Sequence, residues 1–380
     1  MRPFPPLVAL LALLALGAPA SAQCTLAGLD DSPRMPGVPF EELSRRADEA
    51  WEADRVEEAA RFYRGGVELN PLWHDGWWRL GQLLSDVSCH EAAREALRRV
   101  VQLKPGAGPG WVLLGLSEYR LGEYDQAFAD LSHGISLGAA AAPEIGQRGL
   151  HALTLLLIRR GDFTAPSKNL AILVRIEPDD PELVAACGLM ALRRPRLPSE
   201  TPEAEREVVA VAGRAACAAF SGRAEESRNG FRELAARYPA VRGVHFAYGL
   251  VLAREGSPEA LPVLKREIEL FPDNGEAHLE IAFAILERGE ARDALEAARA
   301  AARLLPDSAW SHFALGRALL ATGSVAEAVT ELEEASRLGP DVRDVYVALA
   351  QAYARAGRAS DVERARETLR RLDAAQTPGR

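Results

Sequence analysis

The stretch SHFALGRALLATGSVAEAVTELEEASRLGP (residues 311–340) decides the fold of this chain. Small residues recur in it at helical spacing, Gly323 interrupts it near the middle, and Pro340 closes it. Glycine supplies a tight turn at a helix end, and proline stops a helix because it lacks the N–H that would continue the hydrogen-bond ladder. The stretch therefore predicts two helices that are joined at Gly323 and end at Pro340.

The same pattern returns along the chain with a regular period. Pro71 and Pro105 are 34 residues apart, and the same spacing separates Pro272, Pro306 and Pro340. A first helix, a short break and a second helix precede each proline, and the break usually carries glycine: Gly122, Gly161, Gly222, Gly256, Gly289, Gly323 and Gly357. Because stacked repeats of this kind bury a continuous core, the sequence predicts an all-α solenoid.

This pattern resembles the tetratricopeptide repeat, a helix–turn–helix unit. Residues 77–105 carry the family's positions in Trp77, Leu80, Gly81, Ala93 and Pro105. Residues 111–137 carry them again in Trp111, Leu114, Gly115, Tyr124 and Ala127. The resemblance covers nearly all of the chain after its N-terminal segment. It implies a superhelical solenoid of about 8–9 repeats whose first helices line a concave groove that binds a partner segment.

One irregularity divides the array. Pro178 and Pro239 are 61 residues apart, which is short of two periods, and RPRLPSETP (194–202) is rich in proline. We predict an N-terminal block at 40–193, a joint at 194–202, and a C-terminal block at 203–380 that ends in a charged capping helix. The alternative is one continuous solenoid with a distorted repeat at this place.

The N-terminus has the form of a secretory signal peptide. Arg2 supplies a positive start, Leu7 to Leu16 form an apolar run too short for a membrane span, and Ala20-Ser21-Ala22 forms a small-residue cleavage site. We predict a signal peptide at 1–22, followed by an extended arm at 23–39. The alternative is a retained anchor. With the alanine- and arginine-rich composition, this indicates an exported bacterial protein in the periplasm.

Export changes the interpretation of the four cysteines. An even number in an oxidising compartment indicates disulfides, and four cysteines allow three pairings. A bridge between Cys24 and Cys89 would fix the arm to a turn between two helices, and would leave Cys187 and Cys217 in neighbouring helices. The alternative is four buried thiols.

Charge and motifs point away from several classes of function. The chain has 45 basic and 54 acidic residues and a net charge of −9, which disfavours nucleic acid and anionic membranes as partners. We find no motif of a catalytic, metal or cofactor site, and predict that the protein is not an enzyme. His245, His278 and His312 recur at repeat spacing, about 10 Å apart, which is too far for shared metal ligation and indicates packing residues.

The first-helix positions of the repeats are the best candidates for binding. By register, the groove-facing residues are mainly apolar and aromatic, and they include Trp51, Trp78, Leu116, Tyr119, Leu155, Phe246, Phe283, Trp310 and Phe313. They predict a non-catalytic scaffold of the bacterial envelope that binds a peptide or helix of a protein partner. Tight coiling or the N-terminal arm could instead cover this face. The alternative function is a soluble periplasmic binder of a small ligand such as a glycan or peptidoglycan fragment.

Overall fold

The computed structural model describes Cys24 and residues 37–139 and 142–376. Nineteen α-helices, one short 3₁₀ helix and no strand lie in this part of the chain, so the all-α prediction is confirmed. None of the helices found there is long and apolar enough to span a membrane. The predicted signal peptide and almost all of the predicted arm lie outside the described residues.

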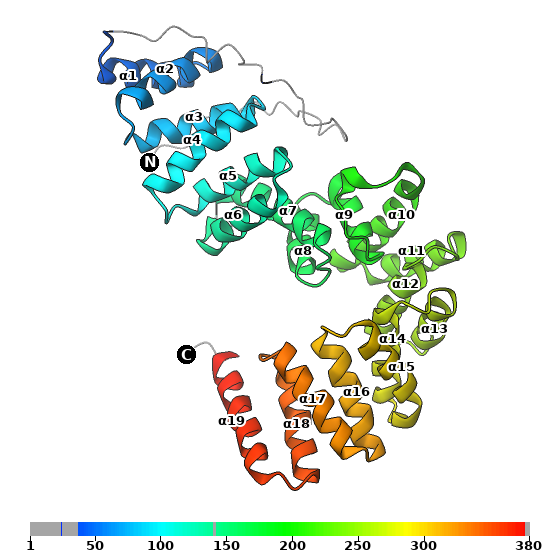
Figure 1. The fold of residues 1–380 in the computed structure, drawn as a ribbon. Helices are drawn as coiled ribbons and strands as arrows, with labels where there is room; N and C mark the ends of the chain where they lie inside the picture. Colours follow the sequence, from blue (N-terminus) through cyan, green and yellow to red (C-terminus); the bar gives the residue numbers. More distant parts are fainter. Residues whose placement is uncertain (1–23, 25–36, 140–141, 377–380) are drawn as a thin grey trace. The chain divides into compact units, whose positions relative to one another are not determined.

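The chain forms two compact units. The first contains the residues up to 190 together with 194–206, and the second contains 191–193 and 207–380. Figure 1 shows that the helices of each unit follow one another as antiparallel pairs. The helices of the first unit are α1 (Phe40–Glu52), α2 (Val56–Leu69), α3 (His74–Asp86), α4 (His90–Leu103), α5 (Gly108–Arg120), α6 (Tyr124–Ser136), α7 (Pro143–Arg159), α8 (Pro166–Ile176) and α9 (Pro181–Ala191).

The second unit continues the pairing. Its helices are α10 (Glu203–Phe220, whose first residues belong to the first unit), α11 (Ala224–Arg237), α12 (Val244–Arg254), α13 (Ala260–Leu270), α14 (Gly275–Glu287), α15 (Ala291–Leu304), α16 (Ala309–Thr322), α17 (Val325–Leu338), α18 (Arg343–Arg355) and α19 (Ala359–Gln376). The helix α9 follows the fourth pair without a second helix of its own, and the 3₁₀ helix Pro198–Glu200 comes before α10.

The opening stretch shows why each pair forms. Gly316 lies where α16 meets α17, and a Cβ atom there would come within 2.6 Å of the Leu332 side chain. Only a residue without a side chain allows this close approach of the two helices. Between them, Gly323 has a φ of 91° at the end of α16, in the left-handed region that favours glycine. All seven predicted turn glycines have positive φ.

The first helices of successive pairs form a layer of their own in each unit. In the first unit α3 contacts α5 and α5 contacts α7, and in the second unit α12, α14, α16 and α18 contact one another in turn. Each first helix also packs on its own second helix, which lies on the other side of the core. We call the exposed side of the first helices the first-helix face; the predicted groove residues belong to these helices.

Candidate functional site

A recurring hydrogen bond fixes each first helix to the proline before it. In six repeats, the residue six positions after the proline donates from its side chain to the proline carbonyl, at 2.8–3.1 Å. The pairs are Trp77–Pro71, Trp111–Pro105, His245–Pro239, His278–Pro272, His312–Pro306 and Tyr346–Pro340. Because a carbonyl only accepts, the histidine Nε2 atoms carry the hydrogen. The histidine column thus consists of structural donors, in the positions that tryptophan and tyrosine take elsewhere.

The predicted groove residues at the N-terminal end pack against polar neighbours. The Trp51 ring meets the Tyr63 ring edge to face, with centroids 6.4 Å apart, and the Arg79 guanidinium lies 4.6 Å from the Trp51 ring centroid. Trp78 is half-buried and stacks on the His74 ring at 6.4 Å. These contacts cover part of each indole ring, so both tryptophans offer edges rather than open faces.

The middle of the first unit is more closed than its sequence suggests. Leu155 is buried in α7, whereas Leu116 and Tyr119 on α5 are half-buried. The Tyr119 ring lies 5.7 Å from the Tyr124 ring, and burial raises the pKa of the Tyr119 hydroxyl. A continuous apolar groove therefore does not extend through these three positions.

The second unit holds an aromatic cluster formed by Phe283 of α14 and Trp310 and Phe313 of α16. Its ring centroids lie 5.7–6.3 Å apart, and two of the three contacts are edge to face. Trp310 keeps 44% of its surface exposed, while Phe313 is 5% exposed and forms the base of the cluster. Phe246 of α12 is buried and contributes to the core beneath this face. Of the nine predicted groove residues, these three aromatic residues lie together.

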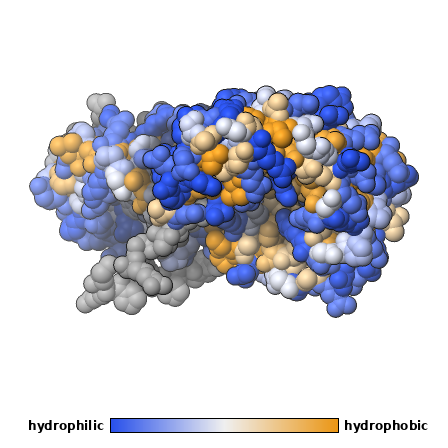
Figure 2. Space-filling view, turned by 90° about the horizontal axis from the view of Figure 1, so that it is seen from below, coloured by the Kyte–Doolittle hydropathy of each residue, from blue (hydrophilic) through white to orange (hydrophobic). Residues whose placement is uncertain are grey.

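Leucines extend the apolar character of this face. Leu250, Leu279 and Leu286 are partly buried and pack on the core of the second unit beside Phe283. The Arg317 guanidinium lies 5.5 Å from the Phe313 ring centroid, within range of a cation–π contact. Figure 2 shows apolar residues gathered in patches between charged ones on the side of the molecule that it presents.

Charged groups border the aromatic cluster on the side of α12. Arg193 forms an ion pair with Glu276 and places its guanidinium 5.2 Å from the Phe246 ring centroid. One turn further along α14, burial raises the pKa of the Glu280 carboxyl, although Arg193 and Arg254 act against this. Sequence analysis missed both groups, because neither lies in a recognisable motif.

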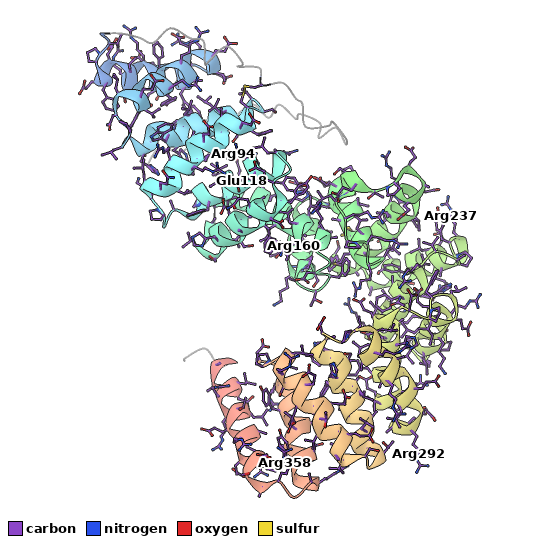
Figure 3. All side chains as sticks on the ribbon, in the orientation of Figure 1. Arg94, Glu118, Arg160, Arg237, Arg292 and Arg358 are labelled. Atoms are coloured by element: carbon purple, nitrogen blue, oxygen red, sulfur yellow. A yellow bond between two sulfur atoms is a disulfide. The ribbon has the colours of Figure 1, made fainter. Side chains whose placement is uncertain are left out.

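The first unit contains a buried pair of carboxyl groups, Glu118 on α5 and Asp130 on α6. Glu118 is fully buried, and burial together with the Asp130 carboxyl raises its pKa to about 8. Arg98 of α4 approaches to 3.5 Å, and Gln126 donates to Asp130 at 3.1 Å. Figure 3 labels Glu118 next to Arg94 of α4. No opening or nucleophile accompanies the pair among the described residues, and we assign it to the stability of the unit.

The cysteines occupy two different settings. Cys24 and Cys89 form a disulfide, with Cα atoms 4.5 Å apart, that links the chain before α1 to the turn between α3 and α4. Cys187 of α9 and Cys217 of α10 are buried, and their pairing stays a prediction. In the part of the chain that the structure describes, no group of three or more metal-binding side chains occurs.

Comparisons with known proteins agree with the helical pairs. Residues 286–345 and 256–309 match two sequence families, each described as tetratricopeptide repeat. No curated protein matches the chain.

Several solved structures are similar at low identity. A MamA fragment from Desulfovibrio magneticus RS-1 is 19% identical, with a TM-score of 0.40, and covers 45% of this chain and 98% of that one. A tetratricopeptide repeat protein from Parabacteroides merdae is 14% identical, with a TM-score of 0.33, and covers 82% of this chain and 98% of that one. Yeast Tom70 is 13% identical, with a TM-score of 0.36, and covers 89% of this chain and 92% of that one. These low scores leave the assignment to the matched repeats and to the helix pairs around them. The chain is a tetratricopeptide repeat protein.

Proposed function

We propose that this protein is a non-catalytic scaffold of the bacterial envelope that binds a peptide or helix of a partner protein on the first-helix face of its second unit. Tetratricopeptide repeat proteins bind protein partners, and their repeat fold is typically non-catalytic. The observation that carries the proposal is the aromatic cluster of Phe283, Trp310 and Phe313, in which Trp310 is 44% exposed.

The physical reason is the free energy stored in this exposed ring. A half-exposed tryptophan that stands on a buried aromatic base is already oriented, so a partner loses little side-chain entropy when it covers the ring. Residues of this kind typically contribute about 2 kcal/mol or more to an interface when they are fully desolvated. Leu279 and Leu286 extend the apolar surface along α14 and would exclude water around the contact.

The envelope is supported by the N-terminal sequence and by the disulfide. The first 22 residues have the order of a secretory signal peptide. The bond between Cys24 and Cys89 fits an oxidising compartment, where such bonds form and persist. Intact-mass analysis of the protein from its own cells tests this: we expect a chain that starts at Gln23 and contains the Cys24–Cys89 bond. A full-length, reduced chain would contradict export.

Site-specific photo-crosslinking tests the binding face. A photoreactive phenylalanine analogue at position 310 should yield a discrete adduct with one partner protein in the native cells. The matched control places the same analogue at Leu72, an apolar side chain that is 76% exposed in the first unit. We expect no such adduct from position 72, and we expect Phe283→Ala to weaken the adduct formed at 310. Equal adducts from both positions, or none from 310, would remove this face from consideration.

A small-ligand binder is the second candidate, because aromatic rings also serve as platforms for sugars. A surface hollow along α11 does not support it, since Arg223, Glu226, Asn229 and Glu233 line this hollow without an aromatic ring. Thermal melting in the presence of envelope glycans and peptidoglycan fragments separates the two functions. A raised melting temperature that Trp310→Ala abolishes would favour the small ligand over the protein partner.

A further inference from the structure

The face of α14 beside the aromatic cluster carries three carboxylates. Glu276, Glu280, Phe283 and Glu287 follow one another at spacings of four, three and four residues, which places them on one side of the helix. Two of these positions already have defined surroundings: Glu276 pairs with Arg193, and Phe283 contacts both rings of α16. The acidic row therefore borders the exposed apolar surface of the second unit directly.

The chain itself shows how a cation is held on this face. The Arg193 guanidinium lies over the Phe246 ring, with 5.2 Å between its central carbon and the ring centroid, while it pairs with the Glu276 carboxylate. Arg193 keeps this position although its φ of 55° is in the left-handed region, which is unfavourable for a residue with a side chain. An aromatic ring and a carboxylate together thus hold a guanidinium at the first position of the acidic row.

The next position of the row has the same two components and no bound cation. Glu280 lies one turn beyond Glu276 and three residues before Phe283. Among the described residues, we find neither a hydrogen bond nor an ion pair for its half-buried carboxylate. Burial raises its pKa; the nearby Arg193 and Arg254 lower it, and Glu276 and Glu287 raise it further. With Glu276 paired, two carboxylates and one arginine remain, so the local charge is negative.

We propose that the partner segment places a lysine or arginine side chain between Glu280 and Phe283 and an apolar side chain against Trp310. This inference rests on the proposed function and specifies its partner as a segment that is both basic and apolar. A cation at Glu280 would neutralise a carboxylate that is already partly removed from water, which makes the hydrogen bond strong. The net charge of −9 would favour approach of a basic segment over an acidic one.

The ring distances define the spacing of the two side chains. The Phe283 and Trp310 centroids are 6.3 Å apart. Side chains on the same face of an extended segment are two residues apart, or about 6.6 Å. We therefore expect the basic residue and the apolar residue at positions i and i+2 of the partner segment.

Selection from a random peptide library displayed on phage tests the proposal without knowledge of the natural partner. The bait is the full chain as secreted. We expect the enriched peptides to share a lysine or arginine two residues from a leucine or an aromatic residue. For the strongest peptide, Glu280→Gln should weaken binding about tenfold, the size expected for a charge-assisted hydrogen bond. Glu287→Gln, an exposed carboxylate on the same helix, should change the dissociation constant by less than about twofold.

The outcomes distinguish this inference from the proposed function. If acidic or uncharged peptides are enriched, or none at all, or if Glu280→Gln leaves binding unchanged, the cation seat is refuted. If Trp310→Ala abolishes binding in that case, the apolar face still binds a partner and the proposed function survives. If Trp310→Ala has no effect either, both fail. The glutamine has the size of glutamate, and unchanged helical circular dichroism and melting temperature would show that the variant is folded.

Discussion

At the scale of single residues, the buried pair of Glu118 and Asp130 is the part of the molecule most sensitive to pH. Glu118 is fully buried where three helices meet, with Asp130 on α6 and Arg98 on α4 as its charged neighbours. Burial and the Asp130 carboxyl raise the pKa of Glu118 from its ordinary 4.5 to about 8. The folded protein therefore keeps a proton on Glu118 that the unfolded chain has already released at neutral pH.

The consequence for stability has a definite sign. Between about pH 4.5 and 8 the unfolded state gains free energy by ionising Glu118, so this residue makes unfolding easier as pH rises, by up to about 1.4 kcal/mol per pH unit. Glu118→Gln removes the proton and with it this dependence. We expect the melting temperature of E118Q to exceed that of the wild type by an amount that grows from pH 5 to pH 8 and is constant above it.

The control for this prediction lies on the neighbouring helix. Glu95 of α4 is exposed, and Glu95→Gln should shift the melting temperature equally at every pH in this range. Differential scanning calorimetry at four or five pH values measures both variants. A difference between E118Q and wild type that does not vary with pH would show that Glu118 is ionised in the folded state.

Single residues also show what the sequence could and could not reveal. The glycine turns were predictable, because only glycine recurs at a 34-residue spacing between helices. The equivalent turns of the first two repeats were not, since Asp54 and Ser88 adopt positive φ there without glycine. The Glu118–Asp130 pair was invisible for a different reason: its two residues belong to different helices, and only the packing of α5 on α6 brings them together.

At the scale of helices, the side-chain hydrogen bond to the preceding proline determines how one pair continues into the next. Tryptophan, histidine and tyrosine all occupy the donor position. The sequence contains this signal, because an aromatic N–H or O–H donor follows each of the six prolines by six residues. It was not recognised, because the histidines were compared with one another instead of with the prolines before them.

Replacement of one donor tests the role of this bond. His278→Phe should lower the free energy of unfolding by about 1 kcal/mol, because the Pro272 carbonyl loses its donor. His278→Trp keeps an N–H in the position that Trp77 and Trp111 use, so its free energy of unfolding should stay close to that of the wild type. Urea unfolding followed by circular dichroism gives both values. Equal loss in the two variants would mean that ring packing, and not the hydrogen bond, is what His278 contributes.

Register alone located the groove residues on the correct helices but not their depth. Phe246, Leu155 and Phe313 belong to the first helices, as predicted, yet they are buried. Their exposure depends on how closely the neighbouring first helices approach, which small residues on several helices decide together. Trp310 stays exposed at the start of α16.

At the scale of the whole molecule, the disulfide sets the two units apart. The bond between Cys24 and Cys89 closes a loop with a sequence separation of 65 residues in the first unit. Such a loop restricts the unfolded chain and contributes about 4 kcal/mol to stability in the chain-entropy estimate. The second unit has no share in this bond, so reduction should act on one unit only.

The prediction is that Cys24→Ser lowers the melting temperature of the first unit and leaves that of the second unchanged. Tryptophan fluorescence follows the first unit, because Trp51, Trp73, Trp77, Trp78 and Trp111 lie in it and only Trp310 lies in the second. Dithiothreitol should shift the fluorescence midpoint of the wild type and leave that of C24S unchanged. A shift of C24S by dithiothreitol would show that a second reducible bond stabilises the molecule.

The bond from residue i+6 to proline also defines where the chain can be cut and rejoined. The acceptor is the last residue of one repeat and the donor lies in the first helix of the next, so each bond crosses a repeat boundary. A shortened or lengthened version that is spliced between proline and donor still receives a donor from whichever repeat follows. Tryptophan, histidine and tyrosine are interchangeable in this role, so repeats that differ in sequence share one joint, and the array can gain or lose whole repeats by recombination without new contacts being evolved at the seam.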